Sequence, residues 1–269
     1  MNEALVLAGA LGGAIGALLG LTGAGGGVLA MPALMLGLGL GLTEAVPVSL
    51  AAVALAATLG AVVGLRKGIV RYRAAMLMAA LGMVSAPVGL WLGHEIPQTV
   101  LTVVFCLLML YIAARMLRKR PAPAPGEACL VEERNCMLDP LTGRFKWNTR
   151  CSFTLGLIGC TAGLFTGMLG VGGGFLIVPA FRQFSDLSMQ AASATSLAVI
   201  ALVSASTATG SLLHGGGFDS TGLTFILATA SGLMVARAFS ARIPEHWLQR
   251  GLGVVILGVA VVWLGKQFF

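Results

Sequence analysis

The sequence predicts an all-α polytopic membrane protein built from two inverted repeats of about five helical segments each. Composition is the first of three observations behind this prediction. The chain has 269 residues, of which 57% are apolar and only 10% are charged, and its mean hydropathy is +0.94. A soluble domain is about one quarter charged. The net charge is +7, and the basic residues behind it lie between the apolar runs, where they orient a chain in a lipid bilayer. We therefore expect no nucleic-acid partner.

An internal repeat is the second observation. The apolar runs cover residues 4–21, 26–41, 45–65, 74–93 and 97–117, and then 152–168, 173–185, 191–213, 221–241 and 245–265. The second set follows the first at a constant shift of 147 positions, so that Pro32 aligns with Pro179. Duplications of this kind build many transporters. We expect a first repeat over 1–117, a linker over 118–150 and a second repeat over 151–269.

The distribution of Lys and Arg is the third observation. Basic residues mark the turn at 66–73 and the linker 118–150 as cytoplasmic, whereas the equivalent turn of the second half, 213–220, carries none. Inverting one half relative to the other places every basic residue except Lys266 in the cytoplasm. An odd number of segments per half allows this inversion, and both termini are then extracytoplasmic.

The first two runs of each half have about 16 to 18 residues, fewer than the ~20 that a full span needs. We interpret each pair as a hairpin broken by glycines, and the sequence leaves open both a re-entrant hairpin and two full spans. Within the first run of each half, glycines lie four apart on one helix face, which predicts close helix packing. These glycines are Gly12, Gly16 and Gly20, and Gly159, Gly163 and Gly167.

The breaks themselves are the triple glycines at 25–27 and 172–174. Adjacent glycines disfavour a helix, and irregular backbone at membrane depth occurs only where protein buries it or water reaches it. The helix that follows each triple glycine begins with unpaired N–H groups, which bind anions without a basic side chain. Pro32 and Pro179 follow; each either sits in a first helical turn, where proline is tolerated, or kinks a helix that has already begun.

Hydroxyl side chains near the breaks complete the predicted site. Ser49 and Ser196 are symmetry mates, although a hydroxyl can instead bond to the carbonyl one turn back in its own helix. The predicted substrate-binding residues are Thr22, Gly23, Gly25, Gly26, Gly27, Ser49, Thr166, Gly170, Gly172, Gly173, Gly174, Thr195 and Ser196. Arg182 and Arg237 are expected at a cytoplasmic mouth, where they draw in anions or, alternatively, only snorkel to water.

Other functional classes lack their motifs. No strand precedes the glycines as a dinucleotide fold requires, no lysine completes a phosphate-binding loop, and neither a catalytic triad nor a carboxylate pair occurs. We therefore expect no enzyme activity, no cofactor and no metal. Among the five cysteines, Cys129 and Cys136 lie in the linker, and its expected cytoplasmic location predicts no stable disulfide there.

The doubled Gly-x-Gly-Gly-Gly-x-x-x-x-Pro stretch, Gly23 to Pro32 and Gly170 to Pro179, together with the two similar helical halves, resembles the sulfite exporter TauE/SafE family of bacterial membrane permeases. The resemblance covers nearly the whole chain except the linker. It implies a multi-pass protein of the bacterial inner membrane that exports small sulfur-containing anions, such as sulfite or organosulfonates.

The sequence leaves alternatives to export open. They are import of thiosulfate or a related sulfur donor, an anion channel, and a membrane sulfur-relay or scaffold component that uses Cys129 and Cys136. The oligomeric state is also open, and a homo-oligomer is one of its alternatives.

Overall fold

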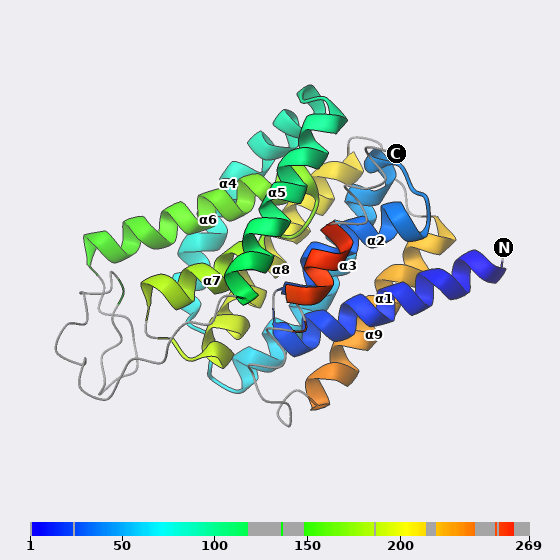
Figure 1. Cartoon of the computed structure of the whole chain (residues 1–269). Coiled ribbons are helices and arrows are strands. Elements are labelled where there is room, and N and C mark those ends of the chain that lie inside the picture. Colours follow the sequence, from blue (N-terminus) through cyan, green and yellow to red (C-terminus); the bar gives the residue numbers. More distant parts are fainter. Residues whose placement is uncertain are drawn as a thin grey trace.

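The computed structural model describes residues 2–23, 25–117, 136, 148–185, 187–213, 219–239, 251 and 253–260. This part of the chain is helical apart from its turns and one isolated bridge between Cys136 and Ser185. The elements are α1 (Asn2–Thr22), η1 (Gly25–Leu29), α2 (Ala30–Gly37), α3 (Leu42–Arg66), α4 (Tyr72–Glu95), α5 (Gln98–Leu117), α6 (Thr149–Leu169), α7 (Gly174–Phe184), α8 (Met189–Leu213) and α9 (Ser220–Phe239). Residues 253–260 are also helical. The predicted all-α class is confirmed (Figure 1).

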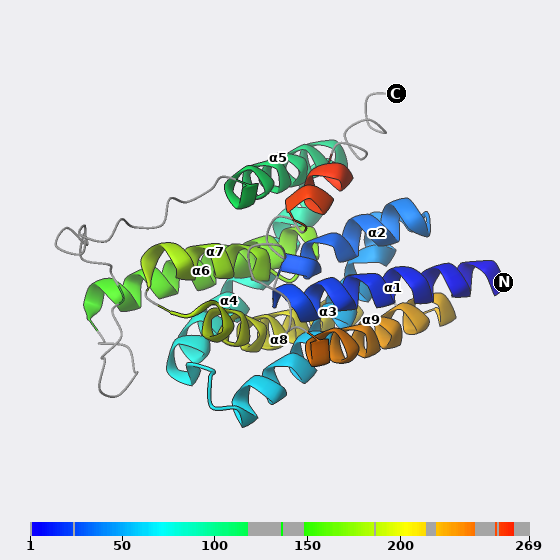
Figure 2. The same ribbon diagram turned by 60° about the horizontal axis from the view of Figure 1, so that its bottom comes forward.

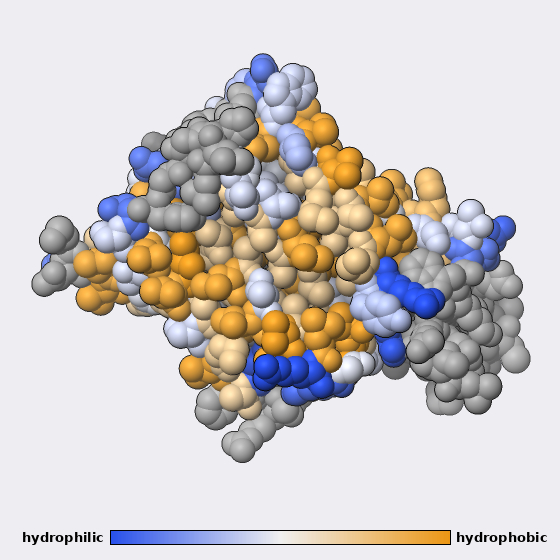
Figure 3. Space-filling model, turned by 180° about the vertical axis from the view of Figure 1, so that it is seen from behind, coloured by the Kyte–Doolittle hydropathy of each residue, from blue (hydrophilic) through white to orange (hydrophobic). Residues whose placement is uncertain are grey.

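Six of the described helices, α1, α3, α4, α6, α8 and α9, are long and apolar enough to cross a membrane. Their outward side chains include large apolar residues such as Val84, Trp91 and Phe153, which are 74%, 62% and 72% exposed. Figure 3 shows the consequence on one face, where apolar side chains form a broad surface and hydrophilic ones gather toward its margins. The chain is a multi-pass membrane protein.

The expectation of two short legs in each hairpin is wrong for the first leg. Helices α1 and α6 each have 21 residues, or about 31 Å at 1.5 Å per residue. Their polar ends extend them beyond the apolar runs, and α6 gains a cap because the Thr149 N–H donates to the Asn148 side chain at 2.8 Å. Only the second legs are short, with 8 residues in α2 and 11 in α7.

Two helix pairs depend on glycine. In the first pair, the contacts between α1 and α9 join Gly12 to Phe225, Gly16 to Thr229 and Gly20 to Leu233. In the second pair, the contacts between α6 and α4 join Gly159 to Met78, Gly163 to Gly82 and Gly167 to Ala86. In each pair the positions advance together by four residues, so the two helices run parallel. The predicted packing role of these six glycines is confirmed.

Helices α3 and α8 form the centre of the molecule and run antiparallel. Gly60 of α3 lies against Leu197 of α8, and Gly64, one turn later in α3, lies against Ala194, earlier in α8. Most residues of both helices are buried, and they pack against α4 and α9 as well.

The ends of the helices fall into two groups. Helices α1 and α9 begin together, with Gly9 near Thr224, and α4 and α6 begin together, with Gly156 near Leu81. Figures 1 and 2 show these two groups at opposite ends of the bundle. The turn between α3 and α4 lies at the end where α6 and α8 begin, because the Arg71 N–H donates to the Thr195 hydroxyl at 3.1 Å. Helix α8 therefore separates this turn from the start of α9.

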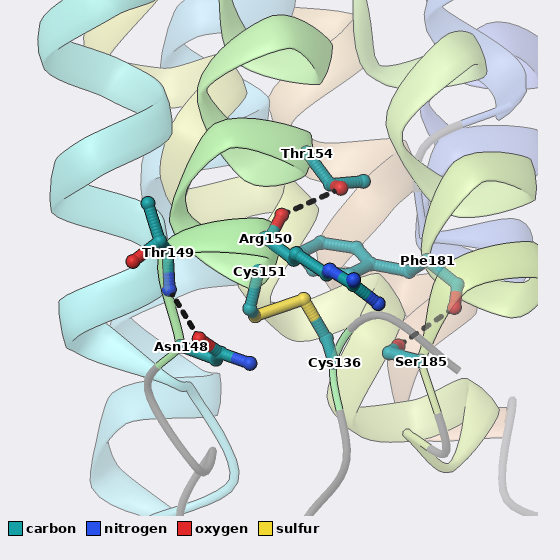
Figure 4. Close-up of a disulfide and its surroundings, with 8 residues drawn as sticks. All are labelled: Cys136, Asn148, Thr149, Arg150, Cys151, Thr154, Phe181 and Ser185. Carbon is teal, nitrogen blue, oxygen red and sulfur yellow. Dashed lines mark hydrogen bonds between the residues drawn. A yellow bond between two sulfur atoms is a disulfide. The ribbon is translucent and has the colours of Figure 1, made fainter. Parts of the chain in front are cut away.

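The linker contributes one described residue, and it corrects an expectation. Cys136 forms a disulfide with Cys151 in the first turn of α6, with 4.9 Å between the Cα atoms (Figure 4). The Cys136 N–H also donates to the Phe184 carbonyl at the end of α7. The expectation of no disulfide in the linker is thus wrong for Cys136, because the fold returns it to α6 and α7. Cys129 lies outside the described residues.

The glycine contacts between α1 and α9 predict a specific stability difference. A methyl group on Gly16 overlaps the Thr229 carbonyl, whereas one on Gly13, on a neighbouring face of α1, has no atom within 4 Å. We expect Gly16→Ala to lower the free energy of unfolding by about 1–3 kcal/mol. The control Gly13→Ala should be neutral or gain up to about 1 kcal/mol of helix propensity. Thermal denaturation in detergent measures both, and equal melting temperatures for the two variants would contradict the packing role.

Candidate functional site

The two glycine breaks meet at the middle of the central helix pair. Gly27 lies against Val53, near the centre of α3, and Gly172 lies against both Val53 and Ile200, near the centre of α8. The breaks also touch each other, since a Cβ on Gly27 would lie 3.4 Å from the Val171 carbonyl oxygen. Both breaks therefore lie level with the centres of α3 and α8, although they follow full-length first legs.

The second break is a left-handed turn that only glycine fills without strain. Gly170, Gly172 and Gly173 have φ angles of +64°, +77° and +56°. A Cβ on Gly173 would lie 2.5 Å from the Thr166 hydroxyl and 2.6 Å from the Ala162 carbonyl oxygen. Helix α7 then begins at Gly174 with no side-chain cap. The Gly174 N–H donates to the Gly172 carbonyl at 2.6 Å and the Leu176 N–H donates to the Gly173 carbonyl at 3.1 Å, so the other N–H groups of the first turn are the ones left for a ligand.

The first break differs from the second. Gly23 adopts a φ of +82°, but residues 25–29 form the 3₁₀-helix η1 rather than an open turn. The i→i+3 bonds of a 3₁₀-helix use N–H groups that an open turn leaves available. Gly26 packs on the backbone of α1, where a Cβ would lie 2.7 Å from the Leu19 Cα. The expected break is present in both halves, but the two copies offer different donors.

The two prolines after the breaks also have different positions in their helices. Helix α2 begins at Ala30, so Pro32 lies in its first turn, where a missing N–H costs nothing. Helix α7 begins directly at the glycines, so Pro179 lies inside it. Pro32 thus follows the first alternative, a proline in a first helical turn, and Pro179 lies in a helix that has already begun.

Ser49 and Ser196, which the repeat aligns, also have different hydrogen-bond partners. The Ser49 hydroxyl is buried and donates to the Gly170 carbonyl at 2.8 Å, which joins α3 to the second break. The Ser196 hydroxyl donates to the Ser193 carbonyl in its own helix at 2.9 Å. The local-bonding alternative therefore holds for Ser196 and fails for Ser49.

The other predicted hydroxyls divide between the break and the end of the bundle. Thr166 is bonded to the Ala162 carbonyl and lies beside Gly173. Thr22 is bonded to the Leu18 carbonyl. Thr195 donates to the Ala191 carbonyl and accepts from the Arg71 N–H, and this places it at the α3–α4 turn.

Three residues at the breaks were not predicted as site residues. Val53 touches both breaks, and the Ser193 hydroxyl donates to the Thr22 carbonyl at 3.3 Å beside Gly23. The Ser204 hydroxyl is fully buried, 3.3 Å from the position that a Cβ on Gly172 would occupy, and has no hydrogen-bond partner in the described part of the chain. Periodicity assigns these residues to helices but does not show which face meets a break.

The predicted arginines are only partly placed. Arg237 of α9 donates to the Gly60 carbonyl of α3, at the end of the bundle where α8 begins. Arg182 lies in α7, and its side chain is outside the described residues. Arg71, which was not predicted as a site residue, lies at the same end of the bundle, and its Nε is buried without a partner among the described residues. The described cations thus lie toward one end of the bundle.

The chemistry at the breaks suits a small anion. Among the described residues, the nearest neighbours of the break glycines include no charged side chain, so peptide dipoles and hydroxyls supply the polarity. In apolar surroundings such donors act on an anion more strongly than they do in water.

Comparisons with known proteins identify relatives of the chain. The family model described as "Sulfite exporter TauE/SafE" matches residues 7–262. A "Probable membrane transporter protein" of Xylella fastidiosa strain 9a5c is 30% identical over 97% of this chain and 96% of its own length, and one from strain Temecula1 is 29% identical over the same shares. The "Probable membrane transporter protein MamO" of Magnetospirillum gryphiswaldense is 28% identical over 65% of this chain and 30% of its own length. No solved structure matches.

The cross-helix bond of Ser49 predicts a difference between the two symmetry mates. Ser49→Ala leaves the buried Gly170 carbonyl without this donor, which should cost about 1–3 kcal/mol of unfolding free energy. Ser196→Ala removes only a local bond and should cost less than about 1 kcal/mol. Thermal denaturation of both variants in the same detergent measures the difference. Equal destabilisation would show that the Ser49 bond does not hold the break.

Proposed function

The chain belongs to the sulfite exporter TauE/SafE family, and from that premise we propose that it is a secondary transporter that exports small sulfur-containing anions such as sulfite or organosulfonates. The anion binds at the glycine breaks through peptide N–H groups and hydroxyls, and alternating access moves it across the membrane. The protein performs no chemical conversion of its substrate.

One observation carries this proposal: the second break presents an uncapped helix N-terminus at the centre of the molecule. Helix α7 begins at Gly174, after three left-handed glycines, and one of them, Gly172, meets the middle of α3 and α8. The N-terminus of a helix carries roughly half a positive charge, and its N–H groups point at a bound anion. Transporters with broken helices place substrates at such ends.

The inverted repeat belongs to the proposal, and the helix contacts support it. Gly12 pairs with Phe225 and Gly159 pairs with Met78, so each contact maps onto the other when both positions shift by 147. Helices α3 and α8, which the same shift aligns, are antiparallel. Two halves with opposite directions can rock against each other around a fixed central site.

The orientation is proposed from the basic residues. Arg66, Lys67 and Arg71 place the α3–α4 turn in the cytoplasm, together with the starts of α6 and α8. The linker is then cytoplasmic as well. The Cys136–Cys151 disulfide favours the opposite assignment, because stable disulfides are rare in the cytosol. We favour the basic residues because they are spread over several loops.

Replacement of the break glycines should abolish transport. Gly26→Ala and Gly173→Ala each introduce a methyl group against backbone atoms, so the break cannot hold its shape. We expect efflux of radiolabelled sulfite from proteoliposomes to fall to the protein-free background, while Gly13→Ala keeps the wild-type rate. Each variant is also checked for membrane insertion and a monodisperse elution profile.

A substrate panel accompanies this test, with sulfite, sulfate, sulfoacetate, taurine and thiosulfate compared on the wild-type protein. Wild-type flux in well-inserted Gly173→Ala would refute the role of the break. A wild-type protein that moves none of these compounds would refute the proposed substrate class.

The proposed inversion predicts that the α3–α4 turn and the start of α9 face opposite sides of the membrane. Lys67→Cys and Ser220→Cys, both at exposed positions, are introduced into a variant without the native cysteines. In intact cells a membrane-impermeant maleimide should label only the Ser220→Cys protein, and after cell lysis it should label both. Labelling of both in intact cells would exclude the inverted arrangement. Labelling of only the Lys67→Cys protein would reverse the orientation.

A further inference from the structure

Six Ser and Thr hydroxyls of helix α8 donate to backbone carbonyls, whereas the Ser204 hydroxyl donates to none in the described part of the chain. The hydroxyls of Ser and Thr in a membrane helix usually donate to a carbonyl one turn back. In α8 the hydroxyls that donate to carbonyls are those of Ser193, Thr195, Ser196, Ser206, Thr207 and Thr209. Ser204 is fully buried among them, and its hydroxyl has no partner among the described residues.

A buried hydroxyl without a partner costs about 1–3 kcal/mol relative to a bonded one. A helix can avoid that cost by rotating the hydroxyl onto its own backbone, as Thr207 does one turn away. Such a cost is typical of functional sites, where the missing partner is a ligand.

Ser204 lies against the second glycine break. Its Oγ is 3.3 Å from the position that a Cβ on Gly172 would occupy, and α7 begins two residues further on. The side chains of Val53 and Ile200 lie against the same glycine, so an apolar wall surrounds the hydroxyl. Ser204 therefore adds a donor to the N-terminus of α7 in a place that excludes water.

The described part of the first half has no such unpaired hydroxyl at its break. The position aligned with Ser204 at the repeat shift of 147 is Ala57, and the first break is wound into η1. The two breaks are thus unequal in both side-chain and backbone donors.

We infer that the second break alone is the anion subsite of the transporter. The Ser204 hydroxyl donates a hydrogen bond to an oxygen of the bound oxyanion, alongside those N–H groups in the first turn of α7 that do not bond to the Gly172 and Gly173 carbonyls. This inference rests on the proposed function. It specifies that function further, because it assigns the substrate contact to one half and to a hydroxyl that the pattern of repeats does not mark.

The test compares Ser204→Ala with Thr207→Val in the full-length protein. Thr207 is buried like Ser204, but its hydroxyl is bonded to the Val203 carbonyl, and valine keeps its volume. Without ligand, Ser204→Ala should melt at or above the wild-type temperature because it removes an unpaired polar group, while Thr207→Val should melt at or below it. A merely structural Ser204 would instead lower the melting temperature.

Binding of sulfite, measured by isothermal titration calorimetry under anaerobic conditions, is the second readout. Loss of a hydrogen bond to an anion should weaken sulfite binding by Ser204→Ala about 10- to 100-fold, whereas Thr207→Val should stay within about twofold of the wild type. Unchanged binding by Ser204→Ala would overturn the subsite and leave the transporter assignment standing. A wild-type protein that binds neither sulfite nor sulfoacetate would overturn the proposed function, and the subsite with it.

Discussion

The fold depends on close approach between backbones, which only glycine permits. Gly16 meets the backbone of Thr229 and Gly163 meets the backbone of Gly82, and these contacts hold α1 to α9 and α6 to α4. Inside a bilayer, burial of apolar side chains does not drive helices together, so close van der Waals packing must do so. The same residue type then serves a second purpose at Gly172 and Gly173, where left-handed backbone ends one helix and starts another in the middle of the molecule.

This second use of glycine explains how the two halves can have similar sequences and still differ in the conformation of their breaks. In the second half the break stays open, with three glycines at positive φ, and Ser49 of the first half donates to its Gly170 carbonyl. In the first half the triple glycine winds into η1 and packs on Leu19 of α1. A bond from α3 therefore supports the open break, while local winding supports the closed one. Two similar sequences can thus give one turn at positive φ and one turn wound into a 3₁₀-helix.

The sequence predicts the helices well because membrane spans are long and apolar. The run at 45–65 becomes α3 over Leu42–Arg66, and the run at 191–213 becomes α8 over Met189–Leu213. What periodicity cannot predict is the partner of a polar group, since that depends on the residue opposite it in another helix. Ser49 and Ser196 have the same place in the pattern and different bonds, and Ser204 aligns with an alanine. The Cys136–Cys151 disulfide was missed for the same reason, because the return of the linker to α6 leaves no trace in composition.

The separation of charge from the breaks fits a site that must release its ligand. An arginine at the centre of a bilayer is costly, and a direct ion pair there would hold an anion tightly. The described structure keeps Arg71 and Arg237 toward the end where α8 begins, and Arg237 is held there by the Gly60 carbonyl. Peptide dipoles and one hydroxyl bind more weakly than a charge, and they cannot trap the anion by neutralising it. Under the proposed function, the cations at this end raise the local anion concentration and the neutral donors at the centre bind the anion briefly.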